Sequence, residues 1–450
     1  MTGSLKNPRI LILCLMTIPA LLLNYIPASA EDKPDNEISE LDLTGVWNTF
    51  DSCFSSTAYT LIITQEGRRI SLAPTVGNYP SCNGTLTGTG LNLSCIEGPG
   101  PADSCEMTAD VLDNASFTLS RVPANCGSTA CAFTRHTGLD PIVKEMLKRV
   151  NFAESILPLG QRSPWQMRGY MLRSCFWSWL MPCAPVAAIH RTFIPGPNGF
   201  IPAQIYVPEG KGPFPIVVFY HGGGWVVGSS LEFDHFSRQL ADGASVMVIS
   251  VDYRLAPEHV FPAAHEDAYA ALEWAAENAG RFGGDPARLA VAGESAGANL
   301  AIAVSIRARD SGGPEILHQT LMCPITNVAT MNTASYHDYA AGYMLTREWM
   351  EAFRSYYLPD CGDWSDPRVS PLLLEDSAEL PPALVITGDF DVLRDEGETF
   401  ARQLFAAGVA VRHYRGGGVI HGFTTALIDY LDQSRNAVSL ISAELRQVFE

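Results

Sequence analysis

Charged residues are scarce in this chain of 450 residues, and basic residues are scarcer than acidic ones. Charged side chains make up 17% of the sequence, with 30 Lys and Arg against 48 Asp and Glu, for a formal charge of -18. An excess of negative charge repels phosphate groups at long range, which argues against nucleic acid as a partner. The acidic residues are scattered and form no long run, which is typical of a solubility feature rather than of a recognition surface.

Sequence patterns for metals and nucleotide cofactors are also missing. The chain has no HExxH, no complete GxGxxG and no Walker loop. These patterns supply zinc ligands and phosphate-binding loops in other proteins. We therefore expect neither a metal nor an organic cofactor.

Residues 1–30 have the pattern of a secretory signal. A basic start is followed by the apolar stretch from Ile10 to Leu23 and by the small residues Ala28-Ser29-Ala30, which suit cleavage. The alternative is an uncleaved membrane anchor, but an apolar stretch of about 14 residues is short for a spanning helix, and Pro19 interrupts it. We therefore expect a secreted protein, extracellular or periplasmic, with no stable membrane anchor once the signal is removed.

Residues 31–135 predict a small β-rich module. The segment is rich in Thr, Ser, Gly and Asn, and it holds alternating runs such as residues 59–64 and 116–119, which are typical of strands separated by turns. In an exported protein its six cysteines favour up to three disulfides, although the sequence does not choose their pairing. These are Cys53, Cys82, Cys95, Cys105, Cys126 and Cys131. We expect the module either to bind a cell-surface or polymeric ligand or to stabilise the chain.

The other cysteines and three sugar-acceptor patterns leave alternatives open. Cys175 and Cys183 are close enough in sequence to close a small loop, whereas Cys323 and Cys361 are expected to be either free or paired. Acceptor patterns for N-linked sugars begin at Asn83, Asn92 and Asn114. They matter only if the host glycosylates its exported proteins.

The composition changes after residue 135, and two further regions are expected. Residues 136–188 predict a linker and cap helices, because apolar residues recur at helical spacing between Pro141 and Val150. Over residues 189–450, short apolar runs alternate with helix-like stretches. Runs that are apolar on both faces suit a mostly parallel central sheet with helices on both faces. The clearest runs are residues 216–220, 246–251, 289–292 and 383–387.

A predicted strand-to-helix turn carries the candidate nucleophile, Ser295. An apolar run ends at Ala292, and a small-residue helix is expected from Ala296. The turn has the pattern Gly-x-Ser-x-Gly, made by Gly293, Glu294, Ser295, Ala296 and Gly297. Glycines are needed on both sides because a sharp turn leaves no room for β-carbons. The helix behind the serine directs free N–H groups and a partial positive charge at any anion that forms there.

A glycine-rich loop upstream of the serine carries the other candidate donors. It follows an apolar run that ends at Tyr220 and consists of His221, Gly222, Gly223, Gly224 and Trp225. Consecutive glycines let the backbone pass close to a substrate, and their N–H groups can converge on a carbonyl oxygen as it becomes an oxyanion. We predict that the N–H groups of Gly223, Gly224 and Ala296 form this oxyanion hole.

His421 is the candidate general base among ten histidines. Where a serine stands on such a turn, the acid and the histidine follow it in chain order. Only His413 and His421 lie beyond the acidic region. His413 alternates within a predicted strand over residues 409–414, whereas His421 is expected in a glycine-rich loop after that strand. Reactive residues lie in loops more often than inside strands.

The candidate acid lies in residues 388–397, directly after an apolar run. By spacing alone, Asp389, Asp391 and Asp395 all remain possible. Asp395 is better explained as a first-turn residue that the dipole of the next helix favours. A carboxylate beyond the strand end can hold the required imidazole tautomer and stabilise the imidazolium.

Together these patterns resemble the bacterial hormone-sensitive-lipase-like esterases, a branch of the α/β-hydrolase superfamily. Five shared motifs occur in family order: HGGGW at 221–225, DYRLAPEH at 252–259, GESAGANLA at 293–301, DVLRDEG at 391–397 and HGF at 421–423. The resemblance implies that Asp391 rather than Asp389 is the acid. It also implies oxyanion donors at Gly223, Gly224 and Ala296.

Two positions depart from the family pattern. Glu294 stands where aspartate is more frequent, and Val392 stands where proline is frequent. Neither change replaces a reacting group. We therefore expect the same reaction, with an altered environment around the reacting groups. The resemblance further implies structural roles for Asp252, Tyr253, Arg254 and Glu258.

The combined prediction is an α/β-hydrolase fold with a helical cap, preceded by the disulfide-rich β module. The cap is expected from residues 141–185 and from part of residues 330–358. The expected activity is hydrolysis of small-molecule esters through a Ser-His-Asp acyl-enzyme, and the resemblance implies esters with short to medium acyl chains. An interfacial lipase is the alternative among enzymes, and a catalytically silent binding protein is the alternative outside them. The sequence predicts no oligomeric state.

Overall fold

The computed structural model describes residues 138–156, 163–174, 183–359 and 363–450, together with eight strands between residues 45 and 135. The predicted signal lies outside the described residues, as do Cys175, Cys361 and the side chains of the six cysteines of the β module. Within the described part of the chain, no helix combines the length and apolar character needed to cross a membrane.

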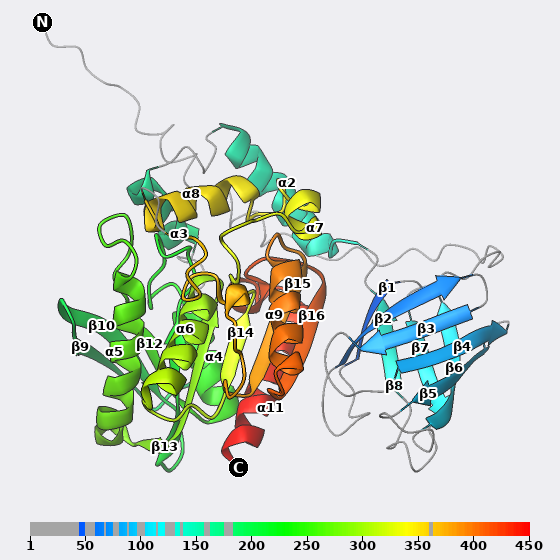
Figure 1. The fold of residues 1–450 in the computed structure, drawn as a ribbon, viewed down its shortest axis with the longest axis horizontal. Coiled ribbons are helices and arrows are strands. Elements are labelled where there is room, and N and C mark those ends of the chain that lie inside the picture. Colours follow the sequence, from blue (N-terminus) through cyan, green and yellow to red (C-terminus); the bar gives the residue numbers. More distant parts are fainter. Residues whose placement is uncertain are drawn as a thin grey trace, which may run out of the picture.

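The eight N-terminal strands pair in chain order and close into a barrel (Figure 1). Each strand is antiparallel to the next, and β1 also pairs with β8. The strands are β1 (Gly45–Thr49), β2 (Tyr59–Glu66), β3 (Arg69–Pro74), β4 (Ser81–Thr87), β5 (Gly90–Ile96), β6 (Ser104–Asp113), β7 (Ser116–Arg121) and β8 (Cys131–Arg135). The alternating runs at residues 59–64 and 116–119 lie in β2 and β7.

The second sheet has eight strands in the order β16-β15-β14-β13-β11-β12-β10-β9. The six strands from β16 to β12 are parallel, whereas β10 and β9 form an antiparallel hairpin at the edge. Their bounds are β9 (Ala188–Gly196), β10 (Gly199–Val207), β11 (Phe214–Tyr220), β12 (Met247–Val251), β13 (Gly284–Glu294), β14 (Gln319–Met322), β15 (Ala383–Phe390) and β16 (Val411–Ile420). The predicted mostly parallel sheet is confirmed.

Helices cover both faces of this sheet because successive strand residues point to opposite sides. In β11, Ile216 and Val218 belong to one buried cluster with residues of α5, α6 and α9. Their neighbours Val217 and Phe219 belong to a second cluster with residues of α4 and α11. The helices are α4 (Asp234–Ala244), α5 (Ala263–Asn278), α6 (Ala296–Ser311), α9 (Arg394–Ala406), α10 (Phe423–Ala426) and α11 (Asp432–Phe449).

Four further helices lie above one end of the sheet (Figure 1). They are α2 (Pro141–Ile156), α3 (Pro164–Ser174), α7 (Ala334–Asp338) and α8 (Arg347–Tyr357). Arg168 of α3 donates hydrogen bonds of 2.8 Å to the carbonyl oxygens of Val226 and Ala256, and its ion pair with Glu258 spans 2.7 Å. These contacts attach α3 to the loops that follow β11 and β12, so the helices cover the carboxyl edge of the parallel strands.

The end of β16 differs from the sequence prediction. The strand does not stop near residue 414 but runs through the glycines to Ile420, so His421 follows the strand directly. The pairing shifts between Gly388↔Gly416 and Phe390↔Ile420, so β16 has more residues than β15 over this stretch. Glycines tolerate such a bulge because it needs unusual backbone angles, and Gly418 has a φ of 73°. The predicted glycine-rich loop is therefore a bulged strand end.

Candidate active site

Ser295 stands on the tight turn between β13 and α6, in a conformation that side chains rarely adopt. Its φ is 56° and its ψ is -119°, a strained combination that costs on the order of 1–3 kcal/mol. Hydrogen bonds on both sides hold the turn, since the Ser295 N–H donates to Met322 O at 2.8 Å and the Ser295 carbonyl accepts from Ile325 N–H at 3.3 Å. A side chain at Gly293 or Gly297 would collide with the backbone of Gly297 or Tyr220, respectively.

The glycine-rich loop after β11 is turned by positive φ angles at three consecutive residues. Gly223, Gly224 and Trp225 have φ angles of 121°, 58° and 60°. The N–H groups of Val226 and Val227 both donate to Gly223 O at 3.0 Å. A β-carbon at Gly224 would collide with the ring of Phe353 in α8. The loop therefore packs closely under the helices that cover the sheet edge.

Two side chains of this loop, His221 and Trp225, pack against aromatic rings of neighbouring segments. The His221 ring is buried and stacks on Tyr253, with ring centroids 4.2 Å apart. The Tyr253 hydroxyl donates to His221 O at 2.8 Å, and burial lowers the pKa of His221. Trp225 stacks on Tyr357 at 4.6 Å. Tyr253 thus contacts the loop directly, as expected of a structural residue.

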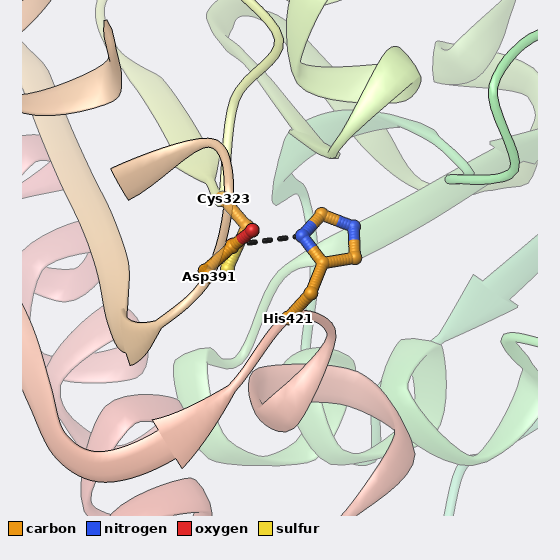
Figure 2. A group of neighbouring side chains, drawn as sticks. All are labelled: Cys323, Asp391 and His421. Atoms are coloured by element: carbon orange, nitrogen blue, oxygen red, sulfur yellow. Dashed lines mark hydrogen bonds and ion pairs between the residues drawn. The ribbon is translucent and has the colours of Figure 1, made fainter. Parts of the chain in front are cut away.

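Asp391 and His421 are brought together from the ends of β15 and β16 (Figure 2). His421 Nδ1 lies 2.8 Å from Asp391 Oδ2, and the Leu393 N–H donates to Asp391 Oδ1 at 3.0 Å. Burial disfavours the charged imidazolium, but the Asp391 carboxylate, its hydrogen bond and Glu294 outweigh burial and raise the pKa of His421. With Nδ1 bonded to the carboxylate, Nε2 is the ring nitrogen left for a proton transfer.

The competing aspartates have other partners. The Asp389 carboxylate accepts from Arg415 Nε at 2.6 Å and from the Gly418 N–H at 3.1 Å. Asp395 accepts from Arg394 Nε at 2.8 Å and from the Ser335 N–H at 2.7 Å. Neither of these bonds involves a histidine.

The competing histidine, His413, lies inside β16. Its Nε2 forms a hydrogen bond of 2.9 Å with Thr387 Oγ1. Burial, aided by the charges of Arg415 and Arg402, lowers the pKa of His413 to about 3. The ring is therefore neutral at ordinary pH and sits within the sheet.

Glu294 links the serine turn to α10, the short helix that follows His421. Its Oε1 accepts from the Thr425 hydroxyl at 2.7 Å and from the Thr424 hydroxyl at 3.4 Å. A β-carbon at Gly222 would lie 3.1 Å from Glu294 Oε2 and 3.5 Å from Ser295 Cβ. Burial raises the pKa of Glu294, while the charge of His421 acts in the opposite direction. The serine turn, the glycine-rich loop after β11 and α10 therefore meet around this carboxyl group.

Cys323 is a site residue that the sequence reasoning missed. Its sulfur and the ligand atoms of Asp391 and His421 all lie within 4.8 Å of one another (Figure 2). Such a trio can hold a metal only when the thiol is deprotonated. Burial, with the charges of Asp391 and Glu294, raises the pKa of the Cys323 thiol well above its usual range, which favours a hydrogen-bonded cluster. The sequence around it offered no signal, because the four preceding residues, Gln319–Met322, do not form an apolar run.

Comparisons with known proteins identify a family and several relatives. A family described as alpha/beta hydrolase fold matches residues 217–425, which include Ser295, Asp391 and His421. The chain is 48% identical over 236 residues to the carboxylic ester hydrolase LipN of Mycobacterium tuberculosis, covering 51% of this chain and 62% of LipN. It is 42% identical to the carboxylesterase NlhH of the same species, covering 50% of this chain and 71% of NlhH.

A solved structure shares the same architecture. An esterase of Pyrobaculum calidifontis superposes with a TM-score of 0.65 at 39% identity, over 69% of this chain and 98% of the esterase.

A further sequence relative is the arylesterase of Saccharolobus solfataricus. It is 37% identical over 253 residues, which cover 56% of this chain and 80% of that enzyme. The similarity to the curated relatives thus spans about half of this chain.

Proposed function

The chain belongs to the hormone-sensitive-lipase-like esterases of the α/β-hydrolase fold, and from this premise we propose that it hydrolyses carboxylic esters with Ser295 as nucleophile. His421 serves as the general base, and Asp391 orients it. The observation that carries the proposal is the 2.8 Å bond between His421 and Asp391, because it leaves Nε2 for the serine proton.

The reaction has two halves. His421 Nε2 takes the proton of Ser295 Oγ as Oγ bonds to the ester carbonyl carbon, and the carbonyl oxygen becomes an oxyanion. The N–H groups of Gly223, Gly224 and Ala296 stabilise that charge. The carbon–oxygen bond to the alcohol then breaks, and His421 returns its proton to the leaving alkoxide. Water, deprotonated by the same ring, cleaves the acyl-enzyme to release the acid and restore Ser295.

The strained serine turn supports Ser295 as the nucleophile. A strained backbone conformation persists only where the surrounding structure holds it, and such strain is concentrated at active sites. The turn places Ser295 at the first residue before α6, whose N-terminus carries a partial positive charge. Negative charge that develops beside this helix end is stabilised.

The direct test is turnover of p-nitrophenyl esters by the wild type and by Ser295→Ala. We expect the variant to lose activity by on the order of 10⁶ in kcat while keeping its unfolding midpoint. A phosphonate probe should label the wild type at Ser295 and leave the variant unlabelled. Retained turnover in a folded Ser295→Ala protein would refute the assignment, and a wild type inert to ester and probe would favour the silent binding protein.

We propose a preference for short to medium acyl chains, as in the family that the sequence resembles. Support comes from α8, which covers the glycine-rich loop. Its Phe353 ring packs against Gly224 and contacts Trp349, with 5.5 Å between ring centroids. A series of esters of increasing acyl length should show kcat/KM falling for long chains. A sharp rise of activity above the solubility limit of the substrate would instead indicate an interfacial lipase.

We further propose that residues 1–30 direct export and that residues 31–135 form a disulfide-stabilised module. The proposal is supported by the signal pattern and by the density of cysteines in that segment. Mass spectrometry of the protein from the medium or periplasm should find an N-terminus after Ala30 and a mass lowered by two for each disulfide. An intact N-terminus in a cytoplasmic fraction would contradict export.

The role of the module can be separated from catalysis by deletion. A chain without residues 31–135 should hydrolyse soluble esters as the full chain does. If the module binds a polymer, only hydrolysis of polymer-bound esters should fall. A loss of stability with equal loss on both substrates would mean that the module stabilises the chain.

A further inference from the structure

Cys323 occupies the turn that joins the serine, the acid and the histidine. It follows β14 directly, is only 1% exposed, and has a φ of 44°. The preceding residue, Met322, accepts the N–H of Ser295 at 2.8 Å, and the Cys323 N–H donates to Ile386 O in β15 at 2.7 Å. The backbone of this turn therefore lies between the serine turn and the strand that carries Asp391.

The side chain of Cys323 reaches the other two residues of the proposed triad. Figure 2 shows the Cys323 side chain next to Asp391, with the imidazole of His421 facing the same carboxylate. The sulfur lies within 4.8 Å of both a carboxylate oxygen of Asp391 and a ring nitrogen of His421. The Asp391 carboxylate and the backbone N–H of Gly422 are among the polar groups that act on the thiol. Because burial and two nearby carboxyl groups raise the pKa of this thiol, it keeps its proton and can only donate to the carboxylate.

We propose that Cys323 is a positioning residue, whose thiol holds the Asp391 carboxylate while its sulfur anchors the backbone next to His421. The inference rests on the proposed ester hydrolysis for its kinetic consequence and on no other assumption about substrate. In this arrangement the Asp391 carboxylate accepts from the Leu393 N–H and from His421 Nδ1, and the proposed third donor is the Cys323 thiol, whose sulfur lies within 4.8 Å.

Removing the thiol has a predictable electrostatic effect on His421. The charged groups that act on the imidazole are Asp391 and Glu294, and the Cys323 sulfur lies within 4.8 Å of both the carboxylate and the ring. A carboxylate that loses a donor keeps more of its charge for the remaining partners, so it stabilises the imidazolium more strongly. The pKa of His421 should therefore rise in a variant without a donor at position 323.

Three substitutions separate donation from packing. Cys323→Ala removes the donor and keeps a β-carbon at the same positive φ, whereas Cys323→Ser keeps a donor of similar size. Cys323→Gly also removes the donor, and glycine suits a φ of 44°. The glycine variant therefore tests the idea even if the alanine variant folds poorly.

The measurement is the pH profile of kcat/KM, beside an NMR titration of the His421 ring and an unfolding curve for each variant. We expect Cys323→Ala and Cys323→Gly to move the acid limb and the ring titration to higher pH and to lower kcat/KM near neutral pH by about tenfold. In Cys323→Ser, the acid limb of the kcat/KM profile should stay at its wild-type pH. If all variants share the wild-type titration, or if serine behaves as alanine does, the inference is wrong.

The two proposals fail in different ways. If the wild type hydrolyses no ester, ester hydrolysis is refuted, yet the NMR titration of His421 still tests the role of Cys323. If the wild type is active and its Ser295→Ala variant is inactive, unchanged titrations in the Cys323 variants refute only the positioning role.

Discussion

Two neighbouring strands, β15 and β16, each carry a pair of residues that compete for the same role. Asp389 lies within β15 and Asp391 just beyond it, while His413 lies within β16 and His421 just beyond it. The members inside the strands form bonds within the sheet, with Arg415 and with Thr387. The members past the strand ends bond each other at 2.8 Å.

The comparison teaches that position relative to the strand end decides the chemistry. Inside a strand the backbone fixes the side chain against neighbouring strands, so a polar group must find its partner there. Past the end, the chain is free to turn the side chain toward the carboxyl edge, where residues from several strands converge. The same residue type is thereby structural at one position and a candidate for catalysis a few residues later.

The largest expected effect comes from the histidine pair. His421→Gln should lower kcat by on the order of 10⁶, because no other group takes the serine proton. His413→Gln should leave kcat near the wild-type value, since that ring is neutral and bonded to Thr387. The measurement is steady-state kinetics on both folded variants. If His413→Gln were as inactive as His421→Gln, the assignment of His421 alone as the base would be wrong.

The aspartate pair should give the next largest effect. Asp391→Asn is expected to lower kcat by on the order of 10⁴, because the amide favours the wrong tautomer of His421. Asp389→Asn should retain activity but lower the free energy of unfolding by roughly 3 kcal/mol, since it breaks a partly buried ion pair with Arg415. Kinetics together with urea unfolding separates the two. Loss of activity in a stable Asp389→Asn protein would contradict the assignment.

The pH dependence should report His421 and not His413. His421 acts as a base only when neutral, and its pKa is raised, so kcat/KM should fall as the pH drops through a value above the ordinary histidine range. Glu294→Gln removes one charge that favours the imidazolium, so the acid limb should move to lower pH. A pH profile of both proteins is the measurement, and a limb that moves upward in the variant would be inconsistent with this electrostatic picture.

The smallest effect is expected from the partner of His413. Thr387→Val removes the hydroxyl that bonds His413 Nε2 at 2.9 Å, which should lower the free energy of unfolding by about 1 kcal/mol. Activity should stay unchanged, because the pair lies inside the sheet. Urea unfolding and kcat/KM are the two readouts. A drop in kcat/KM without loss of stability would connect this pair to the site after all.

Sequence patterns predicted the mostly parallel sheet with its helices and named the candidate residues. The apolar runs at residues 216–220 and 383–387 became parts of β11 and β15, and the helix expected from Ala296 is α6. Chain order favoured His421, and the resemblance favoured Asp391, but spacing alone left Asp389 and Asp395 open. The structure separates them by their partners. Their catalytic roles stay predictions until the variants are measured.

Other features needed contacts between distant segments. Cys323 looked like any cysteine in an apolar context, and nothing in the local pattern connects it with Asp391, 68 positions further by subtraction of their numbers. The sequence placed Glu294 on the serine turn, but its bonds to Thr424 and Thr425 join segments that are far apart in the chain. The strand end at Ile420 was misjudged because the bulge of β16 depends on its pairing with β15.

The sequence by itself determined the parallel sheet, its helices and the tight turn at Ser295, because these follow from apolar periodicity and from where glycine is sterically required. Only the tertiary structure decided which carboxylate bonds His421 and which thiol lies close to that carboxylate. Side-chain partners at the carboxyl edge of a sheet depend on strand order and register, and these are set by packing over the whole domain rather than by any local run of residues.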